Sequence, residues 1–285
     1  MNVTVIGAGL MGSSMGLALR RKGHWVFGSD LQQANAQQAL SIGAFDAVST
    51  LSDAVSRSKL VVVATPVDAA IALLPQLLST IPADCTVMDL GSTKAAICSA
   101  VATHSNRGAF VAAHPMAGKE SGGALGADAL LFHGKPFAIC NQEQSAKEAL
   151  QLVCTTIAEI GARPFFCTAQ QHDSSVALVS HFPQLLAYAY ASLHGFSQDG
   201  WQNLAASGFG SATRLACSPS DVWIPIFEQN NHNIKELVAE MQSVLQLIAD
   251  ALAVNDANAL KSLINSAHAT RRAFDRRVMG EHQNV

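Results

Sequence analysis

Short apolar runs alternate with longer amphipathic segments through the first 168 residues of the chain. The runs expected to be buried strands are residues 3–6, 24–27, 60–64, 86–90, 109–113, 137–140 and 164–167. Helical periodicity lies between several of them, over residues 14–19, 67–78 and 145–160. Regular alternation of strands and helices specifies a doubly wound, mostly parallel sheet. The pattern therefore predicts an α/β domain over residues 1–168.

The pattern changes after Thr168, where helical periodicity continues without further strand-like runs. Thr168 and Gln171 have the spacing of a capping box, which marks the start of a helix. Breaks in the helical pattern are expected at residues 195–200, 207–211 and 218–220, and residues 222–277 are expected to form two or three helices. Residues 169–285 are thus predicted to form an all-helical domain. Its apolar surface exceeds what so small a lobe can bury, which favours packing across a dimer axis.

A glycine pattern follows the first strand and precedes a helical stretch. In G-x-G-x-x-G, the first glycine makes a tight turn, the second admits a pyrophosphate and the third allows close packing of helix and strand. The amides of the helix N-terminus then face the phosphates. The first domain is therefore predicted to be of the Rossmann type and to bind a dinucleotide. The residues expected at the cofactor are Gly7, Gly9, Leu10, Met11 and Gly12, with Thr65 and Pro66 after a neighbouring strand.

The choice of cofactor depends on Asp30, which follows the second strand 18 residues after Gly12. An acid at about this spacing accepts the ribose hydroxyls of NAD. No Arg or Lys occurs within residues 31–38, so nothing nearby would hold the 2′-phosphate of NADP. The sequence therefore favours NAD.

Composition excludes several classes of partner. The chain has 285 residues, enough for two domains, and 49% of them are hydrophobic while only 14% are charged. A net charge of −3 gives no reason to expect nucleic acid or an anionic membrane as a partner. No run of about 20 apolar residues is present. Six cysteines without metal-ligand spacing indicate a reduced, cytoplasmic setting and no metal site.

The strongest candidate for catalysis is His114, which ends the apolar run 109–113 and enters a Pro/Gly turn. Open α/β sheets bind their ligands at the carboxyl ends of strands, where this histidine is expected to lie. Ser92 follows the strand before it. Its hydroxyl either bonds a neighbouring group in the site or caps the next helix, and the sequence leaves both alternatives open.

Two histidines and an arginine are further candidates. His172 and His181 are nine residues apart on one predicted helix, so at about 100° per residue they point to opposite faces and only one can face the cleft. His181 also has the apolar neighbours of a structural core histidine. Arg214 lies beside apolar residues, which suits bidentate binding of a carboxylate, although it could instead pair with Asp221 on the surface.

These motifs together resemble those of the prephenate/arogenate dehydrogenases of tyrosine biosynthesis. The matching segments are the glycine pattern, residues 89–94, 114–120, 171–173, 180–183 and 207–216, and the aromatic positions 223 and 227. The resemblance implies that His114 is the catalytic histidine and that Ser92 orients it. It further implies that His181 and Arg214 contact substrate and that Glu120 belongs to an ionic network over the cleft. Many members carry a basic–acidic pair where this chain has Gly210 and Ser211. At these two positions the chain therefore departs from the family's ionic network.

The activity implied by the resemblance is the NAD-dependent oxidative decarboxylation of prephenate or arogenate by a homodimer. Two alternatives remain open: a β-hydroxyacid dehydrogenase and a non-catalytic NAD-sensing protein. The first resembles enzymes that use a lysine on the first long helix after the nucleotide domain, and residues 170–192 contain none. The second is disfavoured because His114, Ser92 and Arg214 occur together.

Overall fold

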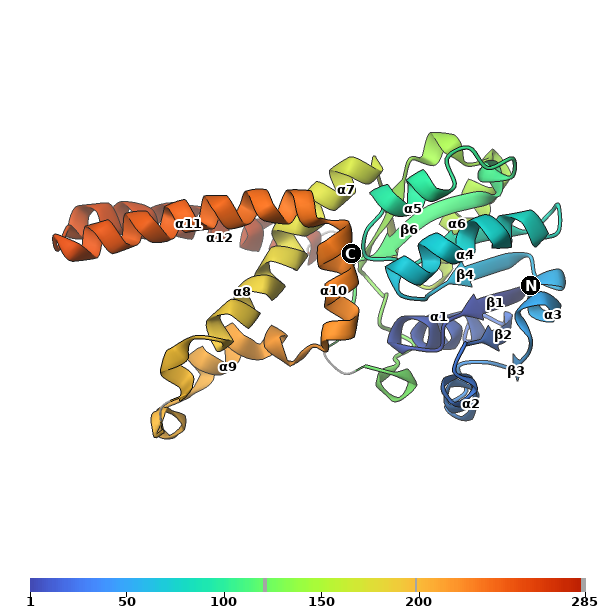
Figure 1. Ribbon diagram of the computed structural model, residues 1–285. Coiled ribbons are helices and arrows are strands. Elements are labelled where there is room, and N and C mark those ends of the chain that lie inside the picture. Colours follow the sequence, from blue (N-terminus) through green and yellow to red (C-terminus); the bar gives the residue numbers. More distant parts are fainter. Residues whose placement is uncertain (120–121, 198, 283–285) are drawn as a thin grey trace. The chain divides into compact units, whose positions relative to one another are not determined.

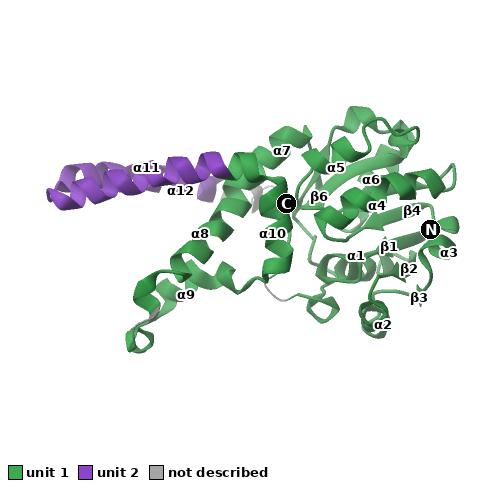
Figure 2. Cartoon of the chain, viewed as in Figure 1, with its two compact units in different colours: residues 1–234 green, residues 235–285 purple. Residues whose placement is uncertain are grey.

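The structure is a computed structural model that describes residues 1–119, 122–197 and 199–282. The chain divides into two compact units, residues 1–234 and residues 235–285, which are described separately (Figure 2). Unit 1 holds the sheet and the helices that position the candidate site. Where it is described, unit 2 consists of helices joined by a short turn at residues 254–256.

Unit 1 is built on an eight-stranded sheet with the order β3-β2-β1-β4-β5-β6-β7-β8. The strands are β1 (Asn2–Ile6), β2 (Trp25–Ser29), β3 (Ala47–Val48), β4 (Leu60–Val63), β5 (Thr86–Asp89), β6 (Phe110–Pro115), β7 (Pro136–Cys140) and β8 (Arg163–Cys167). Neighbouring strands pair in parallel except β6 and β7, which are antiparallel. The predicted doubly wound, mostly parallel sheet is confirmed. The strand order reverses between β1 and β4, the point at which such sheets bind ligands.

Helices cover both faces of this sheet (Figure 1). Apolar side chains of α1 (Leu10–Arg20), α2 (Gln33–Ser41) and α6 (Lys147–Glu159) pack on one face. Those of α3 (Leu51–Ser56), α4 (Val67–Thr80) and α5 (Ala95–Ala100) pack on the other. Strand β4 is apolar throughout because it is buried on both sides. Leu60 and Val62 pack on the face covered by α1, α2 and α6, while Val61 and Val63 pack on the face covered by α3, α4 and α5. Strands buried on both faces have no polar alternation.

The helices that follow the sheet begin at the predicted capping box. Thr168 Oγ1 accepts the Gln171 N–H at 3.1 Å and Gln171 Oε1 accepts the Thr168 N–H at 3.0 Å, so that prediction is confirmed. The remaining helices of unit 1 are α7 (Ala169–Val176), a π-helical turn (Ala177–His181), α8 (Phe182–Ala191), α9 (Ser207–Thr213) and α10 (Ser220–Gln229).

The predicted break at residues 207–211 is wrong, because these residues begin α9. Two glycines and two serines lower helix propensity there. The ring of Phe209 nevertheless packs against Phe196 and Trp201, with ring centroids 5.3 and 4.9 Å apart. Tertiary packing of one aromatic side chain therefore outweighs the weak local preference.

Unit 2 contains the greater part of α11 (Asn231–Ala253) and α12 (Ala257–His282). With α10, these are the helices that the pattern over residues 222–277 predicted. The large apolar side chains that unit 2 exposes include Leu245, Leu247, Leu252, Val254, Ile264 and Phe274. Within the described parts of the chain, no helix combines the length and the apolar character needed to cross a membrane.

Candidate active site

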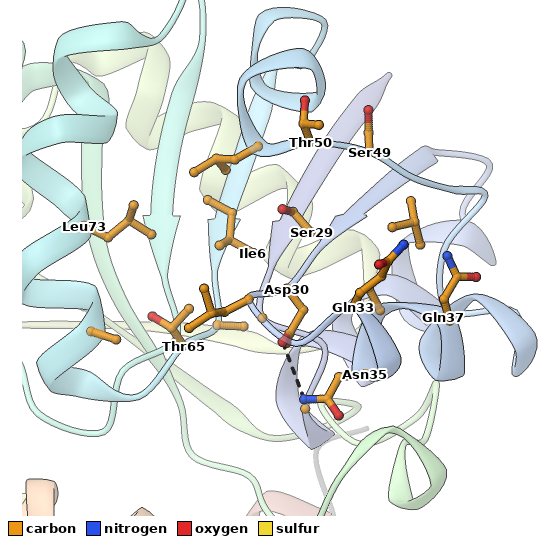
Figure 3. A pocket seen from close by; sticks show the side chains of 18 of the residues that line it. Ile6, Ser29, Asp30, Gln33, Asn35, Gln37, Ser49, Thr50, Thr65 and Leu73 are labelled. Carbon is orange, nitrogen blue, oxygen red and sulfur yellow. Dashed lines mark hydrogen bonds between the residues drawn. The ribbon is translucent and has the colours of Figure 1, made fainter.

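A cavity of about 1080 Å³ lies at the carboxyl ends of β1, β2 and β4 (Figure 3). Its wall includes Gly7, Asp30 and Thr65, each of which comes directly after or shortly after one of these strands. The cavity therefore occupies the place where the sheet order reverses, as expected for a nucleotide site.

The glycines of the first turn leave room that side chains would fill. Gly7 has φ +98°, and a Cβ there would lie 2.5 Å from Ala64 O. A Cβ on Gly12 would lie 1.9 Å from Gly7 O, so α1 can approach the strand only without it. A Cβ on Gly9 would meet nothing within 4 Å, so the backbone at the start of α1 faces open space. This arrangement is the cradle that a pyrophosphate requires.

Asp30 ties the end of β2 to the glycine turn. Its Oδ2 accepts the Ala8 N–H at 2.7 Å, and its Oδ1 accepts the Gln32 N–H at 2.8 Å. Figure 3 shows the carboxylate beside the Asn35 amide, whose nitrogen lies 3.5 Å from Oδ1. A carboxylate has about four acceptor positions, so these bonds leave capacity for the hydroxyls of a ribose.

Thr65 supplies a second sign that the cavity takes a polar ligand. Its Oγ1 is buried at the cavity wall and has no hydrogen-bond partner among the residues that the structure describes. Leaving a buried hydroxyl unpaired costs about 1–3 kcal/mol. A bound dinucleotide would offer this oxygen a partner, so the residues present fit that group.

The structure brings five of the predicted cofactor residues to the cavity wall: Gly7, Gly9, Asp30, Thr65 and Pro66. Leu10, Met11 and Gly12 lie in the first turn of α1 and are not part of that wall. The sequence interpretation missed the apolar side of the cavity, formed by Val48, Leu51, Ala69 and Leu73. The only local signal would have been β3, which is two residues long.

His114 lies near the carboxyl end of β6, as predicted, with its side chain partly buried. Alternate residues of β6 pack on alternate faces: Phe110 and Ala112 belong to the core beneath α4 and α5. His114 continues that set. Its Nδ1 lies 2.8 Å from Nε2 of His172, and the two rings meet edge to face with centroids 5.0 Å apart. The contact joins the end of the sheet to α7.

His172 is held from its other side by the next residue. Its Nδ1 lies 2.7 Å from Oδ1 of Asp173, and both side chains are buried. The Asp173 carboxylate also accepts the N–H groups of Lys94 and Ala95 at 2.7 and 2.8 Å. These amides are at the N-terminus of α5, where a negative charge is stabilised. The sequence interpretation noted residues 172 and 173 but gave them no role.

A buried ion pair between Lys94 and Asp89 joins the ends of β5 and β6 beside His114. Lys94 Nζ donates to Asp89 Oδ2 and, at 2.8 Å, to the carbonyl oxygen of Ala113. Asp89 accepts the N–H groups of Gly91 at 2.9 Å and Ala113 at 3.0 Å. Burying two charges is costly unless they are paired and hydrogen-bonded to further groups, as Lys94 and Asp89 are. The pair fixes the ends of β5 and β6 and hence the backbone beside His114.

The surroundings of His114 disfavour its protonated form. Burial is the main cause that lowers the pKa of His114 well below 6.5, and electrostatic interactions with His172, Lys94 and His181 lower this pKa further. The ring is therefore neutral at pH 7. A neutral imidazole at the end of a strand can accept a proton, which is what a general base requires.

The prediction that His172 and His181 point to opposite faces assumed an uninterrupted α-helix; which of them faces the cleft stays a prediction. Besides burial, electrostatic interaction with both of them lowers the pKa of His114. A π-helical turn, Ala177–His181, lies between them and changes their relative direction. A π turn holds one residue more than an α turn, so nine residues rotate about as far as eight in an α-helix, roughly 800° instead of 900°. The angle between the two side chains falls from about 180° to about 80°.

His181 is itself buried and neutral. Burial is the main cause that lowers its pKa to about 4; the interaction with Asp173 acts in the opposite direction, and the interaction with His172 lowers this pKa further. The Asn230 side-chain nitrogen lies 3.1 Å from His181 Nδ1 and donates to the carbonyl oxygen of Asp173 at 2.7 Å. The His181 ring also meets Trp223 edge to face at 6.1 Å.

The structure does not join the other three predicted site residues to His114 within the described part of the chain. Ser92 is partly buried just before α5, and no hydrogen bond joins it to His114 in the part of the chain that the structure describes. Arg214 is exposed at the start of a short 3₁₀ turn, Arg214–Cys217. Glu120 lies outside the described residues. The roles of these three side chains stay predictions.

Comparison with known proteins relates these two regions to one family. Residues 15–165 match the nucleotide-binding domain of prephenate dehydrogenase, and residues 168–266 match its dimerization domain. The chain belongs to the prephenate dehydrogenase family. It is therefore an oxidoreductase, and the resemblance seen in its motifs is confirmed.

Individual relatives are distant but match nearly the whole of this chain. The prephenate dehydrogenase of Bacillus subtilis is 26% identical over 286 residues, which cover 98% of this chain and 77% of the relative. The cyclohexadienyl dehydrogenase of Zymomonas mobilis is 26% identical over 96% of both chains. Prephenate dehydrogenase from Aquifex aeolicus, solved in complex with hydroxyphenyl propionate and NAD+, has a TM-score of 0.84 at 24% identity and covers 96% of this chain and 98% of its own. That likeness shows the shared fold.

Proposed function

We propose that the protein catalyses the NAD-dependent oxidative decarboxylation of prephenate, or of arogenate, to 4-hydroxyphenylpyruvate or tyrosine. The observation that carries the proposal is a neutral His114 at the carboxyl edge of the sheet, hydrogen-bonded through His172 to Asp173. This base occurs in a chain of the prephenate dehydrogenase family, in the same sheet whose strands β1, β2 and β4 end at a cavity that fits a dinucleotide.

The residues that would hold NAD are those of the cavity wall. The turn at Gly7 and Gly9 would face the pyrophosphate, Asp30 would accept the ribose hydroxyls and Thr65 would use its unpaired hydroxyl. When bound, NAD accepts a hydride from the ring carbon that carries the substrate hydroxyl.

His114 handles the proton of that hydroxyl. Its free ring nitrogen accepts the hydroxyl hydrogen bond and takes up the proton as carbonyl character develops at the ring carbon. Loss of CO₂ leaves the electron pair of the broken C–C bond in the ring, which becomes aromatic. The ring oxygen then takes the proton back, so the product is a phenol. The protein therefore supplies mainly positioning and one site for a proton.

The remaining predicted residues complete this scheme. Arg214 would bind a substrate carboxylate through its planar guanidinium, and His181 and Glu120 would contact the substrate or close the cleft. Ser92 would bond His114 or the substrate. We assign the nucleotide-binding domain to residues 1–168 and the substrate and dimerisation domain to residues 169–285. The change of family match between residues 165 and 168 supports this division. We further propose that the active form is a homodimer.

The test is NADH formation on prephenate, arogenate and 3-hydroxyisobutyrate. Turnover of prephenate or arogenate, with none on 3-hydroxyisobutyrate, is expected; the reverse would make the protein a β-hydroxyacid dehydrogenase, and turnover of none would leave a nucleotide-sensing protein. His114→Asn should lower kcat by about 10²–10⁴-fold, the usual contribution of a positioned base, while NAD affinity stays nearly unchanged. Turnover near the wild-type level in that variant would contradict the role of His114.

We expect prephenate to be preferred over arogenate. The two differ in the side chain, where arogenate carries an ammonium in place of the ketone, so a selective arogenate site should offer a carboxylate near that nitrogen. Gly210 and Ser211 occupy the place where many relatives carry such an acid, which leaves Glu120 as the candidate. Steady-state kinetics on both substrates decides the preference. A kcat/KM at least tenfold higher for arogenate would overturn it, and Glu120→Gln would then test the ammonium's partner.

A further inference from the structure

We propose that His172, held by Asp173, is a positioning residue that fixes the tautomer of His114 and so leaves Nε2 of His114 free to accept the substrate proton. The inference rests on the proposed function, because it concerns how that base is prepared. It starts from a buried chain of contacts that joins Asp173, His172 and His114 at 2.7 and 2.8 Å.

The direction of each hydrogen bond follows from the far end of this chain. A carboxylate only accepts hydrogen bonds, so the contact between Asp173 Oδ1 and His172 Nδ1 requires a proton on Nδ1. In a neutral His172 the other nitrogen, Nε2, is then an acceptor. His114 must therefore donate to it from its own Nδ1. A neutral His114 with its proton on Nδ1 carries its lone pair on Nε2, at the opposite side of the ring.

The same chain also supports the charged state of His114. When Nε2 takes up a proton, the Nδ1–H remains bonded to His172, so the ring does not have to turn during the reaction. The positive charge that forms is linked through His172 to the carboxylate of Asp173. This arrangement offsets part of the cost that burial and neighbouring positive charge impose on the protonated ring.

The anchor of the chain is part of the framework that also carries His114. Asp173 is held by the backbone N–H groups of Lys94 and Ala95, and the Lys94 ammonium bonds the carbonyl oxygen of Ala113, the residue before His114. The segment between β5 and α5 therefore holds both ends of this chain of contacts: its backbone holds Asp173, and the Lys94 side chain holds the backbone next to His114. Support of this kind holds a catalytic group within the narrow limits that chemistry requires.

If His172 has only a structural role, a different result is expected. His172 would then stabilise the fold but would leave the tautomer of His114 undetermined. The decisive measurement is therefore a ¹⁵N–¹H spectrum of the full-length protein labelled at histidine nitrogens, recorded at pH 7.5 without ligand. The His114 signals are assigned by their loss in His114→Asn. We expect the proton on Nδ1 of His114; a proton on Nε2 would overturn the proposal, whatever the enzyme turns over.

A matched pair of substitutions tests the effect on catalysis. His172→Gln places an amide oxygen near the position of Nε2 and can still accept from His114, whereas His172→Leu has a similar size and no acceptor. His172→Leu should lower kcat by about 10- to 100-fold, a part of the contribution of a general base, with KM for prephenate and NAD affinity changed less than about twofold. His172→Gln should recover kcat to within about fivefold of wild type. His104→Leu, a histidine at the opposite edge of the sheet, is the control for the substitution itself.

Other results would overturn the proposal. Equal loss of kcat in His172→Leu and His172→Gln would show that packing, and not the acceptor, matters. Unchanged kcat in His172→Leu, or a His114 tautomer that stays on Nδ1 in that variant, would remove the role of His172. If His172→Leu does not fold, the wild-type spectrum and His172→Gln still decide. Absence of turnover on every substrate would contradict the proposed function and leave the tautomer measurement intact.

Discussion

At the scale of single residues, His114 combines two properties that are usually in conflict. Burial and positive neighbours keep it neutral at pH 7, which makes it ready to accept a proton. The same surroundings make its protonated form unfavourable, which would weaken it as a base. The contact through His172 to Asp173 offsets part of this penalty, so the site can hold a neutral base that is still able to become charged.

The first prediction concerns the pH dependence of turnover. The active form of His114 is neutral, and its pKa lies well below 6.5, so activity should be complete above that pKa and fall as the pH drops through it. The logarithm of kcat/KM should therefore stay flat from pH 8 down to pH 6.5. Burial is the main cause of this low pKa, and interactions with His172, Lys94 and His181 lower it further. An inflection at or above pH 6.5 that disappears in His114→Asn would contradict the lowered pKa.

A second prediction concerns cofactor choice at Asp30. A phosphate about 4 Å from this carboxylate is repelled by about 4 kcal/mol per unit charge at an effective dielectric constant near 20. The kcat/KM for NAD should exceed that for NADP by at least about 100-fold. Asp30→Asn removes the charge but keeps an oxygen for the Ala8 N–H, so the preference should shrink to about tenfold or less.

The control for this change is Asp84→Asn, which removes the same charge at the other end of the strands, where Asp84 pairs with Lys59. It should leave the preference as it is in the wild type. Equal kcat/KM values for NAD and NADP in the wild type would show that Asp30 does not face the ribose.

The sequence predicted those site residues that directly follow a strand. His114 and Asp30 follow apolar runs directly, so their positions at the sheet edge needed only the period of the pattern. His172 could not be assigned, because its contact with His114 spans 58 residues and depends on how α7 meets the sheet. The direction of His181 relative to His172 could not be predicted either, because it depends on a π turn, which has no periodic signal in the sequence.

At the scale of elements, buried strands were the most predictable part of the fold. Strands of four to six residues that are apolar on both faces stand out from their surroundings, and β1, β4, β5 and β6 were found in this way. Elements that contribute little apolar surface were missed: β3 has two residues and α3 has six. These two elements form part of the wall of the nucleotide cavity, which explains why its apolar side was overlooked.

A third prediction concerns the start of α7, which carries His172 and Asp173. Thr168→Ala removes one half of the capping box and should lower the free energy of unfolding by about 1 kcal/mol. Thr168→Ser keeps the hydroxyl and should stay within a few tenths of a kcal/mol of wild type. Urea unfolding of the two variants in parallel measures the difference. Equal stability of both variants would show that the cap contributes nothing to the fold.

At the scale of the whole molecule, both the composition and the exposed surface favour association of the chain with a second copy. Nearly half of the residues are hydrophobic, and α11 and α12 still expose large apolar side chains such as Leu245, Leu252 and Phe274. A solvated monomer rarely keeps apolar patches of this kind exposed. Residues 168–266, which include Leu245 and Leu252, match the dimerization domain of prephenate dehydrogenase, so we expect this face to pack against a second copy of the chain.

The last prediction is that the protein sediments at micromolar concentration with about twice the chain mass of 29.9 kDa. Leu245 and Leu252 are seven residues apart on α11 and so share one face of the helix. Burying each leucine contributes about 1.5–3 kcal/mol, so Leu245→Glu combined with Leu252→Glu should shift the protein toward the monomer. Ser243→Glu adds a charge about 200° around the helix from Leu245 and should leave the dimer intact. A wild-type monomer that stays folded and active at this concentration would show that the exposed apolar face serves another purpose.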